Sequence, residues 1–232
     1  YYYMGISWKD CTGCGVCANV CPAKGKAITM MDKEKAPKKN VSVMFEADLN
    51  KNIAPKNTIK GSQFEKPLFE FSGACAGCGE TPYIKLLTQL FGERLVIANA
   101  TGCSSIYGAS HPSMPYNVSW ANSLFEDNAE FGLGIKIGDM LQKEKIKNIL
   151  RKSNLSEENK QIADEWINDD ENKEAAENML HNFDFSEAIK AERLKKYIMP
   201  KSVWMIGGDG WAYVIGYGGL DHVLSTKQNV NI

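Results

Sequence analysis

Seven cysteines carry most of the chemical information in this 232-residue sequence. Four of them lie within eleven residues, in a run that ends with a proline: Cys11, Cys14, Cys17, Cys21 and Pro22. The C-x2-C-x2-C-x3-C-P spacing suits an iron–sulfur cubane, because a tight loop can present successive thiolates to its corners. Gly13 and Gly15 would let the backbone fold closely around the cluster. We therefore predict cluster ligation here, and we regard a zinc knuckle or a few buried thiols as the weaker alternatives.

This run accounts for only half of a two-cluster ferredoxin, which needs two such runs. The first three cysteines lack a fourth partner, and Cys21 lacks three. We therefore expect residues 1–31 to be the C-terminal half of a 2[4Fe-4S] ferredoxin-like domain, with the chain beginning inside that domain. An odd cysteine count also argues against a secreted disulfide framework, so a reducing, cytoplasmic location is expected.

The other three cysteines surround a predicted helix and strand. Cys75 and Cys78 form a C-x-x-C pair in a glycine-rich stretch, and a helix is expected over Tyr83–Phe91. Its expected boundaries are an N-cap at Thr81, a first-turn Pro82 and a terminal Gly92. The apolar run Leu95–Ala98 predicts a buried strand, and Cys103 follows it. These three thiols could converge on a cluster, but a zinc site, a redox dithiol or simple burial would also fit.

A second chemical motif lies near the end of the sequence. The predicted strand Val203–Ile206 leads into Gly207-Gly208-Asp209-Gly210-Trp211 and then a helix to about Leu224. The glycines would let backbone amides approach a phosphate, and Asp209 offers a hard oxygen ligand to Mg2+. A Gly-Asp-Gly tripeptide is also compatible with an ordinary turn. In a parallel sheet, however, Cys103 and Asp209 would lie along the same ligand-binding edge.

The remaining segments give weaker signals. Residues 32–67 are lysine-rich and are expected to be a linker, with one apolar patch over Val41–Phe45. Asn128 is expected to cap a helix that buries Leu133, Ile137 and Met140. Residues 139–199 are highly charged and predict two or three surface helices in a solvated insertion, one of them starting near Ser153 and Asn154. Residues 229–232 predict the start of another strand.

Bulk composition narrows the function classes. The net charge is -1 and 44% of residues are apolar, which is ordinary for a globular protein. This charge gives no support to nucleic-acid binding. The sequence also contains no apolar run of the ~20 residues needed to cross a bilayer. We therefore expect neither a nucleic-acid nor a membrane partner.

Taken together, these segments resemble pyruvate:ferredoxin (flavodoxin) oxidoreductases, and the order of the motifs resembles the fused, single-chain form. The matching segments are Asp10–Pro22, Lys60–Phe64, Pro67–Leu90, Ala98–Gly108, Asn122–Gly132 and Gly207–Val223. The resemblance implies an α/β fold. Residues 68–232 would form a partial thiamine-diphosphate-binding domain with a parallel sheet, truncated at its C-terminus. Half of a 2[4Fe-4S] ferredoxin-like domain would precede it.

The same resemblance implies the site residues. Cys75, Cys78 and Cys103 would bind the [4Fe-4S] cluster nearest to the organic cofactor. The first three cysteines of the N-terminal run would bind a second cluster, and Cys21 would bind a third. Asp209 would be a Mg2+ ligand. The thiamine diphosphate site would be lined by Glu80, Cys103, Gly208, Asp209, Gly210 and Trp211. No catalytic residue is predicted.

The implied activity is oxidative decarboxylation of pyruvate to acetyl-CoA and CO2, with electrons passing to ferredoxin or flavodoxin in a homodimeric enzyme. Two departures stand out: Val214 replaces the family's usual Asp, and the loop between Tyr116 and Trp120 is shorter. We expect the chain to be an internal piece, inactive alone. The alternatives are an electron-transfer module without catalysis, a structural zinc domain, or an oxidoreductase of another 2-oxoacid.

Overall fold

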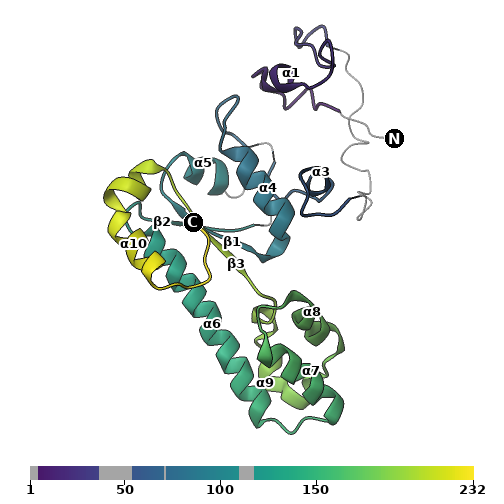
Figure 1. The fold of residues 1–232 in the computed structure, drawn as a ribbon, viewed down its shortest axis with the longest axis vertical. Helices are drawn as coiled ribbons and strands as arrows, with labels where there is room; N and C mark the ends of the chain where they lie inside the picture. The colour runs from purple at the N-terminus through teal and green to yellow at the C-terminus, as the bar shows by residue number, and fades with distance from the viewer. Residues whose placement is uncertain (1–4, 37–53, 71, 110–117) are drawn as a thin grey trace. The chain divides into compact units, whose positions relative to one another are not determined.

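The computed structural model describes residues 5–36, 54–70, 72–109 and 118–232 (Figure 1). These residues divide into two compact units, one reaching to Gly92 and the other running from Glu93 to Ile232. The division falls later in the chain than the boundary between residues 67 and 68 suggested by the sequence. Our domain assignment therefore stays a prediction, and each unit is described by itself.

The described part of the first unit contains the helices α1 (Val16–Val20), α3 (Ile59–Ser62) and α4 (Thr81–Phe91). Helix α4 begins earlier than predicted, because Thr81 is its first residue and Glu80 holds the N-cap position without a side-chain cap. The Thr81 side chain instead contributes to lowering the pKa of the Cys78 thiol, a smaller effect than that of the nearby backbone amides. The predicted end is correct, since Gly92 stops the helix with a φ of 57° that favours glycine.

The last part of the predicted linker packs on α4. The Gln89 amide donates to the Glu65 carbonyl (3.0 Å), and the Leu68 amide donates to the Thr88 hydroxyl (3.0 Å). The Thr58 hydroxyl caps α3 by accepting from the Gly61 amide at 3.0 Å. Hydrogen bonds to α4 thus hold the chain at Glu65 and Leu68. The apolar patch predicted over residues 41–45 lies outside the described residues.

A parallel sheet organises the second unit, which confirms the predicted α/β class. Strands β1 (Leu95–Ala100), β2 (Ser119–Ser123) and β3 (Ser202–Ile206) lie in the order β2-β1-β3. Central strand β1 is buried along almost its whole length, as expected for a parallel strand covered on both faces. A 3-10 turn, η1 (Gly92–Arg94), precedes it. Asn231 adds one parallel bridge to Trp204, at the strand start predicted for residues 229–232.

Helices α5 (Cys103–Ala109), α6 (Asn128–Lys152) and α10 (Tyr217–Ser225) accompany the sheet. The predicted buried face of α6 is partly wrong. Leu133 is buried, but Ile137 and Met140 are 43% and 42% exposed. The predicted capping role of Asn128 is also wrong, because Asp127 holds the N-cap position and Asn128 is fully buried. Charged residues occupy much of the face that α6 does bury.

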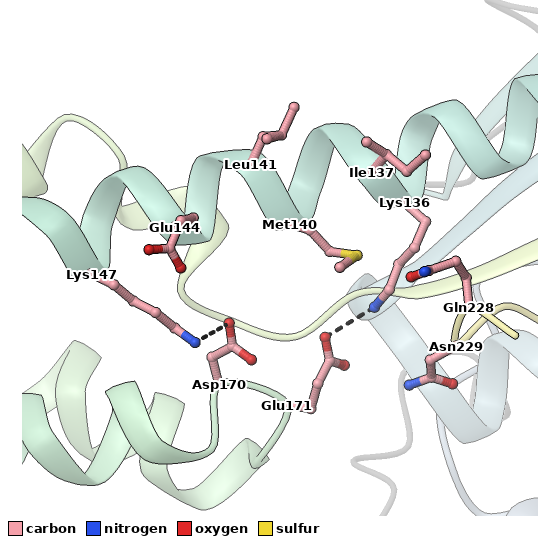
Figure 2. Close-up of a pocket in the computed structure, with 10 residues that line it drawn as sticks. All are labelled: Lys136, Ile137, Met140, Leu141, Glu144, Lys147, Asp170, Glu171, Gln228 and Asn229. Carbon is pink, nitrogen blue, oxygen red and sulfur yellow. Dashed lines mark hydrogen bonds and ion pairs between the residues drawn. The ribbon is translucent and has the colours of Figure 1, made fainter. Parts of the chain in front are cut away.

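Ion pairs explain why charged residues lie on the buried face of α6. Lys136 and Lys143, both buried, contact one carboxylate oxygen of Glu171 at 2.9 and 3.0 Å, and Lys147 pairs with Asp170 at 3.1 Å. Figure 2 shows the pair of Lys136 with Glu171 and the pair of Lys147 with Asp170. Burial alone would raise the pKa of the Glu171 carboxyl, but the hydrogen bonds from both lysines outweigh it and lower the pKa. The ion pairs therefore hold the 169–172 turn against α6 and leave Ile137 and Met140 outside.

The charged segment beyond α6 has a core of its own. It contains α7 (Glu157–Asn168), α8 (Lys173–Asn182), η2 (Phe185–Ala188), α9 (Ile189–Glu192) and η3 (Lys195–Tyr197). Helix α7 starts after Ser156, which caps it, rather than near Ser153. Trp166 is fully buried among apolar neighbours and donates to the Ile198 carbonyl at 3.2 Å. The predicted helices are therefore present, but the segment is not merely solvated, because these helices enclose a core.

Throughout the described parts of the chain, every helix is too short or too polar to span a bilayer.

Candidate functional site

The N-terminal cysteine run is an exposed loop that contains α1, and Cys17 lies in that helix. Gly13 and Gly15 have φ values of 72° and 76°, a backbone conformation that only glycine adopts readily. The thiols of Cys11, Cys14 and Cys17 are exposed. All seven cysteines are thiols rather than disulfides, so their sulfur atoms can serve as ligands.

Cys21 has an environment that favours its thiolate. The backbone amides of Ala23 and Ala27 lower the pKa of the Cys21 thiol, and the Ala27 nitrogen lies 3.3 Å from its sulfur. Because the thiolate is the form that binds iron, this loop is prepared for ligation.

The C-x-x-C pair sits in a tight turn just before α4. The Cys78 amide donates to the Cys75 carbonyl at 3.0 Å, and Gly77 has a φ of 73°. Backbone amides of Thr81 and Glu80, at the start of α4, lower the pKa of the Cys78 thiol. A Cβ at Gly77 would lie 3.6 Å from the Cys14 Cβ. The first unit therefore places this turn beside the N-terminal run.

In the second unit, Cys103 and Asp209 leave the same edge of the sheet. Strands β1 and β3 are adjacent and parallel, with Asn99 opposite Ile206 at their carboxyl ends. Cys103 follows β1 as the first residue of α5, and Asp209 follows β3 after two glycines. The shared edge predicted from the sequence is therefore confirmed, and it is the edge at which parallel sheets bind ligands.

The turn after β3 fits a divalent ion with a diphosphate. The Asp209 side chain is exposed, and a Cβ built on Gly208 would meet no atom within 4 Å. Open glycine backbone and an exposed carboxylate are the donor set that a magnesium-bound phosphate requires. The Gly210 amide approaches one Asp209 oxygen at 2.9 Å.

Trp211 follows this turn but lies in the core. Its side chain is 2% exposed, and a Cβ at Gly207 or Gly216 would come within 2.5 Å of its indole ring. Among the described residues, the indole N–H has no hydrogen-bond partner. The predicted helix begins here as a π-helix, η4 (Gly210–Ile215), a form common at functional sites, and continues as α10. The lining role of Trp211 stays a prediction, as do those of Glu80, Gly208 and Gly210.

A buried polar network at the same edge was missed by the sequence analysis. Asn99 is fully buried in β1. Its amide donates to Ser105 (3.2 Å) and Asn122 (2.9 Å) and accepts from Ser104 (2.7 Å). Ser105 also accepts from the Gly102 amide at 3.1 Å. The network fixes the turn that carries Cys103, and the only available signal was an asparagine inside an apolar strand.

The predicted residues are not all brought together. Cys75 and Cys78 belong to the first unit, whereas Cys103 and Asp209 belong to the second. Their convergence on one cluster therefore stays a prediction. Among the described residues, no three His, Cys, Asp or Glu side chains gather closely enough to hold a metal ion. Tyr116, at the start of the shortened loop, lies outside the described residues.

Comparisons with known proteins match these motifs. The family described as 4Fe-4S binding domain matches residues 4–24. The whole chain aligns at 44% identity with a pyruvate-flavodoxin oxidoreductase of Klebsiella pneumoniae and at 46% with a pyruvate:ferredoxin oxidoreductase of Moorella thermoacetica. It is also 39% identical to a pyruvate dehydrogenase [NADP(+)] of Cryptosporidium parvum. The chain spans 22% of the length of the first two relatives and 15% of the third.

Proposed function

Because the chain is related over its whole length to one segment of the pyruvate:ferredoxin (flavodoxin) oxidoreductases, we propose that it contributes to the oxidative decarboxylation of pyruvate to acetyl-CoA and CO2. The observation that carries the proposal is the shared sheet edge, where Cys103 and the Gly-Asp-Gly turn follow adjacent parallel strands. A ferredoxin-type electron carrier has no need of that second turn.

The cysteines would hold [4Fe-4S] clusters. Cys11, Cys14 and Cys17 would bind one cluster and Cys21 another, in agreement with the 4Fe-4S family match. Cys75, Cys78 and Cys103 would bind a third. When bound, the clusters carry single electrons from the reaction site to ferredoxin or flavodoxin. The backbone amides around Cys21 and Cys78 favour the thiolate state that such clusters need.

The turn after β3 would hold Mg2+ and thiamine diphosphate. Asp209 would bind the metal, and the open backbone at Gly208 would admit the diphosphate. When bound, thiamine diphosphate supplies the nucleophile and the electron sink for decarboxylation. The chain's own contribution would be to hold the diphosphate in the turn after β3, at the same sheet edge as Cys103.

The acceptor and the setting are further parts of the proposal. The names of two relatives include ferredoxin or flavodoxin, whereas the Cryptosporidium parvum relative is named for NADP+. We therefore propose a low-potential carrier protein as the partner, with coenzyme A taking the acetyl group. A homodimer in the reducing cytoplasm would suit a protein with three such clusters.

Because the chain alone is expected to be inactive, the test is pyruvate-dependent electron transfer by the intact protein, meaning the complete enzyme that contains this chain, loaded anaerobically with iron, thiamine diphosphate and Mg2+. We expect pyruvate and coenzyme A together to drive reduction of a viologen dye. Asp209→Asn should abolish this reduction and weaken Mg2+ binding. Asp221→Asn, which changes an exposed aspartate in α10, should retain both. A fully loaded protein that reduces no dye with pyruvate would refute the proposal.

The 4Fe-4S family match over residues 4–24 favours a second candidate, an electron-transfer module without catalysis. In that case the iron would be redox-active but thiamine diphosphate and Mg2+ would not bind. Calorimetric titration of the intact, iron-loaded protein with thiamine diphosphate in the presence of Mg2+ separates the two candidates.

A further inference from the structure

The side chain of Asn128 touches all three strands of the sheet. Asn128 is fully buried at the first turn of α6. Its amide nitrogen donates to the Ala98 carbonyl of β1 and to the Ile206 carbonyl of β3, both at 3.2 Å. Its amide oxygen accepts from the hydroxyl of Ser123, the last residue of β2, at 2.8 Å. Both donor hydrogens and the acceptor are thus used.

These contacts lie at the functional edge of the sheet. Ile206 immediately precedes the Gly207–Gly210 turn that carries Asp209, and Ala98 lies two residues before the end of β1. The surroundings are apolar, with Ala129 and Met205 buried beside the contacts. A buried amide in such a place is costly unless it is fully hydrogen-bonded, and it then fixes one geometry.

We propose that Asn128 is a positioning residue, which holds the ends of β1 and β3 at a fixed spacing and so sets the separation of the Cys103 turn from the Asp209 turn. The inference rests on the proposed function only for what these turns bind. It does not depend on an ionised group, because the amide keeps the same hydrogen bonds at every pH at which the protein folds.

The chain offers a matched control in Asn159. This residue is also a buried asparagine in the first turn of a helix. Its side chain donates to the Asp184 carbonyl (3.3 Å) and accepts from the Asp184 amide (3.0 Å), far along the chain from the sheet edge. Asn128→Leu and Asn159→Leu each replace a buried amide by an apolar group of similar size. Any general cost of that change appears in both variants.

The test compares amide hydrogen exchange in the intact protein. In Asn128→Leu, we expect exchange at residues 101–103 and 207–210 to be faster by about tenfold than in Asn159→Leu, because two strand ends lose their shared donor. Equal exchange at these turns in the two variants would overturn the inference. If Asn128→Leu does not fold, Asn128→Asp is used, since it keeps the shape and the acceptor but loses the donor. Failure of both Asn128 variants to fold beside a folded Asn159→Leu would make the role general stability, and would also overturn it.

Thiamine diphosphate affinity in the presence of Mg2+ separates this inference from the proposed function. We expect Asn128→Leu to weaken binding by about tenfold, in step with the exchange, and Asn159→Leu to bind as the unchanged protein does. Wild-type affinity in an Asn128→Leu protein with mobile turns would overturn the positioning role. An unchanged protein that binds no thiamine diphosphate would refute the function, while hydrogen exchange would still decide the role of Asn128.

Discussion

The cysteine segment and the charged segment differ in how they obtain their order. None of the described residues 5–36 is buried, and α1 has no buried side chain. The charged residues 139–199, by contrast, enclose a continuous apolar cluster around Trp166, Met179 and Ile198, each fully buried. The more polar of the two segments is therefore the one with a core.

The difference shows that charge density is a poor guide to burial. Apolar residues recur along α7 and α8 at helical spacing, with Ala163, Trp166, Ala176 and Met179 on the inner sides. The cysteine segment has no comparable stripe. A segment of that size without a core usually depends on a metal or a disulfide, and its cysteines are thiols. We infer that cluster binding supplies its stability.

The largest expected effect is that of iron removal. Chelation of iron from the intact, anaerobically loaded protein should eliminate hydrogen-exchange protection over residues 5–36. The reason is that ligation replaces the missing core, so that loss of the cluster releases the whole loop. Protection in β1 and in α7 should be unchanged, because their order comes from apolar packing. Hydrogen exchange followed by mass spectrometry measures both regions in one sample.

Cys11→Ser serves as the control for chelator damage, since it removes one predicted ligand without a chelator. It should reduce the iron content and release the same residues. If residues 5–36 kept their hydrogen-exchange protection in the iron-free protein, the cysteine segment would not depend on cluster binding for its stability.

Sequence reasoning succeeded where one residue type has one physical consequence. The apolar run before Cys103 and the glycines around Asp209 predicted two turns at one edge of a parallel sheet, and the structure has them. A strand that is buried on both faces appears in the sequence as an almost continuous apolar run, so it is easily recognised. The Gly92 helix end was equally clear, since few residues accept its backbone conformation.

Prediction from the sequence failed for polar residues whose partners are distant in the chain. Ile137 was predicted to be buried, but Glu171 pairs with Lys136 and Lys143 on the buried face of α6, and Ile137 is exposed instead. The sequence predicted Asn128 to be a helix cap, because it shows only local contacts, yet two of its three hydrogen-bond partners lie 30 and 78 residues away. The buried networks of the candidate site could be found only from the fold.

An intermediate effect is expected from Trp166→Ala. The indole is fully buried, so its loss should lower the free energy of unfolding of the second unit by about 3–5 kcal/mol. Trp166→Phe should cost less, because it keeps most of the volume and loses only the hydrogen bond to Ile198. Chemical denaturation followed by circular dichroism measures both. Iron content should be the same in both variants; a loss of iron in Trp166→Ala would show that the cysteine segment relies on the helical core after all.

The smallest effect is expected from the ion pairs that hold the 169–172 turn to α6. Glu171→Gln keeps an acceptor for Lys136, with which Glu171 is drawn in Figure 2, and for Lys143, but it removes the negative charge between the two lysines. We expect a loss of about 1 kcal/mol in the free energy of unfolding, because the Glu171 side chain is 38% exposed and water screens its charge. Glu144→Gln, in an exposed pair with Arg151, is the matched control and should change stability less.

The pH dependence of this effect has a definite sign. The pKa of Glu171 is lowered on folding, so its contribution is fully present above the pKa of the unfolded carboxyl, about 4.3, and is lost as the pH falls through the folded value. The pKa of neighbouring Asp139 is raised by burial, and its contribution has the opposite sign. The charge of Glu171 is the smallest of the causes that shift the pKa of Asp139, so the contribution of Asp139 largely cancels between the two proteins. The difference in unfolding free energy between wild type and Glu171→Gln should therefore shrink as the pH falls below about 4.3. If this difference in unfolding free energy stayed constant through this pH range, the charge of Glu171 would not contribute, and Glu171 would act by its shape alone. The apolar cluster would then hold the 169–172 turn and its neighbours in place without the charges.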